Sequence, residues 1–337
     1  MKTSIVWARF FIVMAALICG NVDAQSITKP TPTPKKSAST PAAESKMQAS
    51  KSQALKSQAL KSQKPKTKEV TADKIEAYKS IDGVDLNAYI FLPEGHHASD
   101  KRPAIVFFFG GGWNSGSPNQ FVEHCKHLAS RGMVAITADY RVASRHGVKA
   151  ISCVRDAKSA IRWTRQNAAK LGIDPDRIVA GGGSAGGHLA ACTGVINGLD
   201  EPDEDAAISS QPNAMALFNP ALVLAEIVSS STRDTERIED LPARLGVEPK
   251  ELSPFHHVAA NQPPTIIFHG VADSTVPYRT AEKFTAAMKA AGNDCELVGY
   301  KEQEHGFFNY GRGDGSSYGD TLKKLDRFLE RLGYLSN

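Results

Sequence analysis

A glycine-rich turn at residues 182–186, Gly-Gly-Ser-Ala-Gly, restricts the fold of this chain more than any other segment. The apolar run 178–180 precedes it and a stretch with alanine and leucine follows it, which predicts a strand, a tight turn and a helix. Glycine lets the strand and the helix approach closely and tolerates strained backbone. We therefore expect Ser184 to project from this turn, beside a helix N-terminus that favours negative charge. An ordinary turn with a capping serine is the alternative.

Apolar and amphipathic segments alternate along the rest of the chain, which predicts a mostly parallel sheet flanked by helices, an α/β fold. Two of the segments, 104–109 and 265–269, are continuous apolar runs, as expected of central strands buried on both faces. The predicted strands are 75–81, 84–92, 104–109, 134–140, 177–180, 214–218, 265–269 and 295–300. The predicted helices are 119–131, 148–171, 185–196, 279–291 and 318–332.

A serine hydroxyl is a poor nucleophile until a base takes its proton, so the turn calls for a histidine oriented by a carboxylate. The predicted strand 265–269 runs out into Asp273, and the predicted strand 295–300 runs out into His305. Ser184, Asp273 and His305 are therefore the candidate catalytic residues. A turn aspartate and a surface histidine are the alternatives for the last two. Weaker acid candidates lie on the histidine's own loop: Glu302 and Glu304.

Three consecutive glycines, 110–112, directly follow a predicted buried strand. The tetrahedral intermediate of acyl transfer carries an oxyanion that backbone amides stabilise. The amides of Gly111, Gly112 and Ala185 are the candidate donors, and a plain loop is the alternative. We expect two aromatic residues to bind the substrate: Trp113, which follows the glycines, and Phe307, which lies two residues after His305.

No spacing of potential ligands predicts a metal or a cofactor. Histidines occur at 96–97, 124, 127 and 256–257, but none has the pattern of a known zinc motif, and no Cys-x-x-Cys unit is present. Asp156 and the segment 174–177 are predicted to be structural, as ion pairs and a turn. Four cysteines follow the N-terminal region, and the sequence leaves open whether they pair: Cys125, Cys153, Cys192 and Cys295.

The chain divides into three predicted regions. Residues 1–24 have the pattern of an export signal, with Lys2 and Arg9 before an apolar core too short to span a membrane. Residues 25–70 are predicted to be a disordered linker, because Lys, Ser, Thr, Pro, Ala and Gln cannot form a core. Residues 71–337 are long enough for one domain. We expect a secreted or periplasmic protein without a stable membrane span; a lipid anchor at Cys19 is the alternative.

Charge is distributed unevenly between these regions. Residues 25–70 carry ten lysines against Glu44 and Glu69, a net charge of +8, whereas residues 71–337 carry a net charge of −5. The basic tail is interpreted as a solvated tether, and we expect no nucleic-acid partner; contact of the tail with acidic polysaccharide, anionic lipid or nucleic acid is the alternative. The segment 221–256 is rich in Arg, Asp and Glu and predicts a small charged cap. A lid for lipid interfaces would show a large apolar face, so a true lipase is disfavoured.

Four motifs together resemble a known family: Gly-Gly-Gly-Trp at 110–113, Gly-Gly-Ser-Ala-Gly-Gly-His-Leu-Ala at 182–190, Phe-His-Gly-Val-Ala-Asp at 268–273 and Glu-His-Gly-Phe-Phe at 304–308. Over residues 75–335 the chain resembles bacterial carboxylesterases related to hormone-sensitive lipase, and more closely the secreted acetyl-xylan and feruloyl esterase-type members. The resemblance implies the α/β-hydrolase fold and the triad and oxyanion donors named above. Two departures are Phe109 in place of the family's histidine and the missing helical N-terminal cap.

These observations predict a secreted serine esterase that acts on short-chain or aromatic acyl esters, namely acetyl or feruloyl groups of polysaccharide, through an acyl-enzyme. A serine peptidase of the prolyl-oligopeptidase kind is an alternative, although no propeller domain is evident. A non-catalytic, exported carbohydrate-binding protein is the second alternative. The sequence does not determine the oligomeric state.

Overall fold

The computed structural model describes residues 69–224 and 241–336. The predicted signal 1–24 and all but the end of the predicted linker 25–70 lie outside the described residues. Of the predicted charged cap 221–256, residues 225–240 also lie outside them. The described remainder of that cap holds two short helices, α8 (Leu241–Leu245) and η2 (Pro254–His257).

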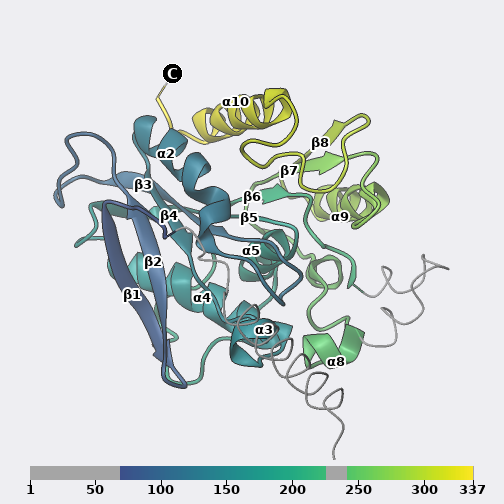
Figure 1. The fold of residues 1–337 in the computed structure, drawn as a ribbon, viewed down its shortest axis with the longest axis horizontal. Coiled ribbons are helices and arrows are strands. Elements are labelled where there is room, and N and C mark those ends of the chain that lie inside the picture. Colours follow the sequence, from purple (N-terminus) through teal and green to yellow (C-terminus); the bar gives the residue numbers. More distant parts are fainter. Residues whose placement is uncertain (1–68, 225–240, 337) are drawn as a thin grey trace, which may run out of the picture. The chain divides into compact units, whose positions relative to one another are not determined.

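One eight-stranded sheet forms the framework, in the order β1-β2-β4-β3-β5-β6-β7-β8 (Figure 1). β1 and β2 are antiparallel to their neighbours, and the remaining strands are parallel to one another. The strands are β1 (Lys74–Ile81), β2 (Val84–Phe91), β3 (Arg102–Phe108), β4 (Val134–Ala138), β5 (Ile173–Gly183), β6 (Ala214–Phe218), β7 (Thr265–Gly270) and β8 (Cys295–Tyr300). All eight predicted strands are present, and the mostly parallel sheet confirms the predicted α/β-hydrolase fold.

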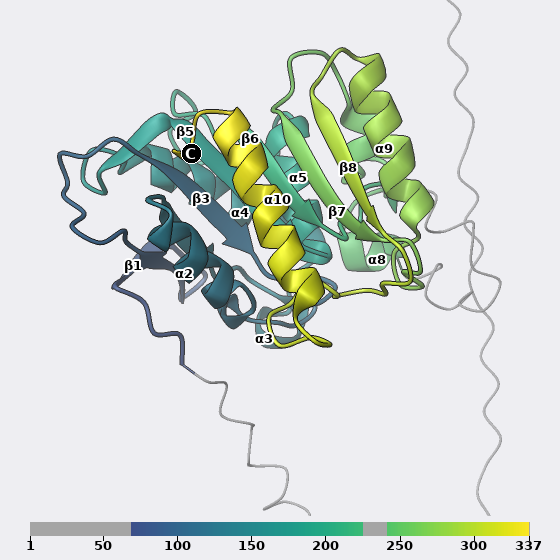
Figure 2. The same ribbon diagram turned by 90° about the horizontal axis from the view of Figure 1, so that it is seen from above.

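Helices cover both faces of the sheet, as predicted. One face carries α2 (Val122–Ser130) and α10 (Ser316–Arg331), while the other carries α4 (Ala150–Gln166), α5 (Ala185–Val195) and α9 (Tyr278–Ala290) (Figure 2). α10 buries a single stripe, Leu322, Leu325, Phe328 and Leu329, as a surface helix should. Every residue of α5 is buried, because this helix fills the centre of its layer directly after the turn at Ser184.

Two helix boundaries differ from the prediction. The helix predicted at 119–131 starts as the 3-10 turn η1 (Pro118–Phe121), with Pro118 in its first turn, and becomes α-helical at Val122. The helix predicted at 148–171 ends at Gln166, since residues 167–172 form turns that lead through Gly172 at φ +63° into β5. A short helix that the sequence did not predict, α3 (Ala143–His146), follows β4.

A buried carboxylate joins the edge of the sheet to α4. Asp156 is fully buried and accepts hydrogen bonds from Arg141 Nη2 at 2.8 Å and Lys79 Nζ at 2.7 Å. The side chains of Arg141 and Lys79 are only 5% and 7% exposed, so all three charged groups are almost completely shielded from solvent. Glu201 pairs with both cations as well, at 2.9 Å from Lys79 Nζ and 3.3 Å from Arg141 Nη2. Each buried charge thus has an opposite charge beside it, which confirms the predicted structural role of Asp156.

A buried histidine lies in the aromatic core on the α2 and α10 face. His124 has no exposed surface, and its ring centroid lies 4.9–6.1 Å from those of Phe107, Phe121, Phe218, Phe308 and Tyr318. Neither ring nitrogen has a hydrogen-bond partner among the described residues. Burial lowers the pKa of His124 to about 3, so the ring is neutral at physiological pH.

Candidate active site

Three of the predicted site residues follow three different parallel strands. Ser184 comes directly after β5, Asp273 three residues after β7, and His305 five residues after β8. The carboxyl ends of parallel strands lie at one edge of the sheet, so these loops converge there. The candidate site therefore lies where loops meet on a rigid scaffold.

The three side chains form one line of hydrogen bonds. His305 Nε2 lies 2.9 Å from Ser184 Oγ, and His305 Nδ1 lies 2.7 Å from Asp273 Oδ2. With Asp273 ionised, Nδ1 carries the proton that it donates, so Nε2 is free to accept the proton of the serine hydroxyl. The structure thus brings together the three residues that the sequence separated by up to 121 positions.

Asp273 is held as a carboxylate by several donors. Its Oδ1 accepts the backbone N–H groups of Thr275 and Val276, both at 2.8 Å. Burial by itself would raise the pKa of Asp273, but hydrogen bonds from His269, His305 and the Val276 amide outweigh it and hold the pKa well below its usual range. The weaker acid candidates, Glu302 and Glu304, are both exposed to solvent.

The turn at Ser184 has strained backbone, as the sequence predicted. Ser184 has φ +54° and ψ −117°, a region that non-glycine residues rarely adopt. A Cβ atom on Gly186 would lie 2.0 Å from the carbonyl oxygen of Phe108, and one on Gly183 would lie 2.4 Å from Phe308 Cζ. The glycines are therefore required because neighbouring backbone and an aromatic ring lie directly against the turn.

The loop of three glycines lies beside the serine. A Cβ atom on Gly110 would lie 3.3 Å from Ser184 Cβ, and Gly111 and Gly112 have φ values of +129° and +62°. Among the described residues, no acceptor takes a hydrogen bond from the N–H groups of Gly111, Gly112 or Ala185. The three amides that the sequence nominated are thus unpaired, and they remain available to a negatively charged oxygen.

Packing and one side-chain amide hold this loop, in which Phe109 stands where the family resemblance implies a histidine. The ring of Phe109 stacks on Tyr140 at a centroid distance of 4.1 Å, and the Tyr140 hydroxyl donates to the Phe109 carbonyl at 2.7 Å. The N–H of Gly110 donates to Gln120 Oε1 at 2.6 Å. Sequence reasoning missed Gln120, because it lies in a predicted helix and belongs to none of the motifs.

The two aromatic residues predicted to bind substrate lie in packed positions. Trp113 is 8% exposed, and its indole N–H donates to His188 Nδ1 at 3.2 Å. Phe307 is 3% exposed and packs on Tyr300 at a ring distance of 4.6 Å, in the core cluster of the α2 and α10 face. Neither side chain offers an open surface, so the predicted contacts with substrate gain no support from these positions.

No group of three His, Cys, Asp or Glu residues in the described ranges 69–224 and 241–336 could hold a metal ion. The four cysteines are free and buried, which answers the question of pairing that the sequence left open. In the same ranges, no helix is sufficiently long and apolar to cross a bilayer.

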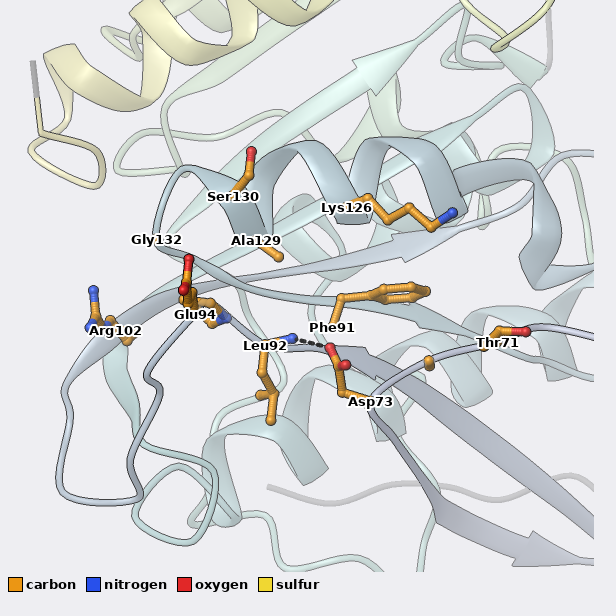
Figure 3. A pocket seen from close by; sticks show the side chains of 12 residues that line it. Thr71, Asp73, Phe91, Leu92, Glu94, Arg102, Lys126, Ala129, Ser130 and Gly132 are labelled. Carbon is orange, nitrogen blue, oxygen red and sulfur yellow. Dashed lines mark hydrogen bonds between the residues drawn. The ribbon is translucent and has the colours of Figure 1, made fainter.

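A pocket of about 610 Å³ lies elsewhere (Figure 3). It is bounded by Arg102 at the start of β3 and by Ser130 at the end of α2, with Asp73 and Leu92 joined across it by a hydrogen bond of 2.8 Å. The pocket thus lies at the amino end of β3, whereas the loop of glycines extends from its carboxyl end. None of the candidate site residues lines it.

Comparison with known proteins agrees with this geometry. The BD-FAE family model matches residues 89–288, more than half of the chain. Esterase LipC of Mycobacterium tuberculosis is 30% identical over 244 residues, which cover 68% of this chain and 58% of LipC. Carboxylesterase NlhH of the same organism is 27% identical over 223 residues, covering 63% of this chain and 68% of NlhH. The chain spans about half the length of the first curated relatives it matches.

Solved structures match over a larger share. Apo Thermogutta terrifontis esterase 2 is 55% identical, with a TM-score of 0.76, and the match covers 80% of this chain and 98% of that one. The same esterase phosphonylated by sarin is 54% identical with a TM-score of 0.77 and the same coverage. From the sheet order, the hydrogen-bonded Ser, His and Asp residues and these matches, we conclude that the chain belongs to the BD-FAE family of α/β-hydrolases and is related to carboxylic-ester hydrolases.

Proposed function

We propose that this chain is an exported serine esterase that hydrolyses short-chain acyl esters, with Ser184 as nucleophile, His305 as general base and acid, and Asp273 as its partner. The observation that carries the proposal is the unbroken line of hydrogen bonds from Asp273 through His305 to Ser184, at 2.7 and 2.9 Å. The strained turn supports it, because it projects the hydroxyl at the carboxyl edge of the sheet, beside unpaired amides.

The reaction follows from these contacts. Ser184 Oγ attacks the ester carbonyl while His305 Nε2 takes its proton, and the negative charge moves to the carbonyl oxygen. The N–H groups of Gly111, Gly112 and Ala185 stabilise that oxygen. His305 then gives the proton to the departing alcohol, and water cleaves the acyl-enzyme by the same steps in reverse order. Asp273 stays ionised throughout, because its donors favour the carboxylate.

The acyl group is proposed to be short. Thermogutta terrifontis esterase 2, 56% identical to this chain in both cases, has been solved with propionate and with butyrate bound. The composition of the segment 221–256, rich in Arg, Asp and Glu, supports the same conclusion, since a lid for lipid interfaces needs a large apolar face. We propose acetyl or feruloyl substituents of polysaccharide as the natural esters, which the resemblance to secreted acetyl-xylan and feruloyl esterases supports.

The test uses the chain from Gln25 onward, which is the predicted mature form. It is incubated with p-nitrophenyl acetate, butyrate and palmitate, with acetylated xylan, with feruloylated arabinoxylan and with a proline amide. We expect release of short acyl groups, weak cleavage of palmitate and no cleavage of the amide. Cleavage of the amide alone would favour the peptidase alternative. Finding the chain only in the cytoplasmic fraction of its native cell would refute export.

The nucleophile is tested by Ser184→Ala in the same assay. We expect turnover to fall at least about 10³-fold while the circular dichroism spectrum stays unchanged, because the folded contacts of Ser184 are mostly made by its backbone. A variant that retained a tenth of the activity would refute the assignment of Ser184.

A further inference from the structure

We propose that Gln120 is a positioning residue that connects the loop of oxyanion donors to the loop of the catalytic histidine, through Asn309. This inference rests on the proposed function and adds to it two side chains that belong to none of the sequence motifs. It begins from the amide of Gly110, which precedes the two glycine donors and lies beside Ser184.

The first half of the connection fixes the glycine loop. Gly110 N–H donates to Gln120 Oε1 at 2.6 Å, and Gln120 Nε2 donates to Asn309 Oδ1 at 2.9 Å. Because a backbone N–H can only donate, the oxygen of the Gln120 amide must face Gly110, and its nitrogen must face Asn309. The orientation of the glutamine amide is therefore determined by its partners.

The second half fixes the peptide that follows His305. Asn309 uses its oxygen for Gln120, so its nitrogen is free to donate, and it donates to the Gly306 carbonyl at 2.8 Å. The N–H of the same residue, Gly306, donates to Asn219 Oδ1 at 3.0 Å. Gly306 is thus held on both sides, directly after the candidate base. Three amide side chains determine where the histidine loop lies.

The backbone segment that carries Gln120 is itself fixed. Gln120 lies in η1, whose first residue, Pro118, accepts a hydrogen bond of 2.9 Å from the buried Thr137 hydroxyl of β4. The glutamine is half-buried, and both of its amide atoms are used. Its side chain is therefore a fixed strut between two loops and not a solvated surface group.

Such a strut is needed because the donors belong to glycines. Three consecutive glycines have wide conformational freedom, yet oxyanion donors act only when they are held within about 0.5 Å of the productive geometry. Phe109 supplies one means of holding this loop, by stacking on Tyr140. The Gly110 to Gln120 bond supplies another, and the continuation to Asn309 places donors and base in one frame. Loss of the strut should therefore weaken binding of the transition state more than binding of the substrate.

The experiment compares Gln120→Leu with Asn309→Ala and the double variant, each in the full mature chain. For p-nitrophenyl acetate we expect Gln120→Leu to lower kcat about 10- to 100-fold while KM changes less than threefold. A trifluoromethyl ketone, which forms a hemiketal oxyanion on the serine, should bind more weakly by a similar factor. The double variant should lose less than the product of the single losses, because both changes break one connection.

A matched control is Gln262→Leu. Gln262 is also half-buried and donates to two carbonyls, those of His257 and Val195, but it precedes β7 at the opposite edge of the sheet. We expect its kcat and inhibitor affinity to equal those of the wild type, whatever its melting temperature. This control separates loss of stability from loss of positioning.

Three results would overturn the proposal: wild-type kcat in Gln120→Leu, a loss of kcat without any loss of inhibitor affinity, or fully multiplicative losses in the double variant. Failure of the proposed function is recognised separately, because Ser184→Ala would then remain active. If Ser184→Ala is inactive and Gln120→Leu is normal, only the positioning role is refuted.

Discussion

Replacing the buried histidine of α2 should make the protein more resistant to acid. In His124→Phe the new ring joins a cluster that is already aromatic, and it removes two nitrogens that have no hydrogen-bond partner among the described residues. The pKa of His124 is about 3 in the folded state, whereas an unfolded histidine has a pKa of about 6.5. The folded protein therefore stays neutral at this position over a range in which the unfolded chain takes up a proton.

The sign and the size of the effect follow from that difference. Above about pH 6.5 the ring is neutral in both states, so stability does not depend on its titration. As the pH falls from 6.5 towards 3, proton uptake by the unfolded chain lowers the free energy of unfolding by about 1.4 kcal/mol per pH unit. Between pH 7.5 and pH 5.0 the wild type should lose about 2 kcal/mol more than His124→Phe loses.

Urea unfolding at both pH values, followed by tryptophan fluorescence, measures this quantity. Leu128→Ala is the matched control, since it removes a buried side chain one turn further along α2 and should lower stability by about 2–5 kcal/mol at either pH. Equal losses in the wild type and His124→Phe between the two pH values would refute the conclusion that this ring stays neutral in the fold.

Two further substitutions test the packing described above. Asp156→Asn leaves the almost buried charges of Arg141 and Lys79 to share the carboxylate of Glu201, apart from the exposed Asp82. One buried positive charge then lacks a counter-charge, so the free energy of unfolding in urea should fall by about 3–5 kcal/mol; a loss below about 1 kcal/mol would contradict the description of the cluster. Gly186→Ala places a Cβ atom 2.0 Å from a backbone oxygen and should lower the free energy of unfolding by at least about 2 kcal/mol. Gly319→Ala is the control: it lies in open space on α10 and should raise the free energy of unfolding by up to about 1 kcal/mol. A Gly186→Ala variant more stable than Gly319→Ala would refute the contact.

The sequence predicted the sheet well because its strands differ so clearly from its helices. β3, β6 and β7 are short strands with a continuous apolar centre, and each is bounded by turn residues. The helix ends were predicted less well, because they depend on individual contacts. The apolar pattern of the predicted helix 148–171 continues past Gln166. The chain nevertheless leaves the helix there, because it has to turn through Gly172, at φ +63°, to pair β5 with β3.

The candidate triad could be predicted because its chemistry requires particular residue types in a particular chain order. Ser184, Asp273 and His305 each follow a predicted strand, so their convergence required only that the strands be parallel. Gln120 and Asn309 could not be found in this way. A side-chain amide has no chemical signature in a sequence, and the 189 positions between these two residues are bridged only by the loops of the folded chain.

Lys79 of β1, whose side chain points inward, affects how readily two molecules could pair along the edge of the sheet. β1 is the outermost strand of the sheet, and outer strands can recruit strands from neighbouring chains. Here the pairing with β2 shifts register between Ala77 and Lys79, and the lysine points inward to Asp156. A second chain aligned along this edge would meet a kinked backbone and a buried charge. The outer edge of β1 is therefore a poor template for aggregation, although Ile75 on the same strand is half exposed.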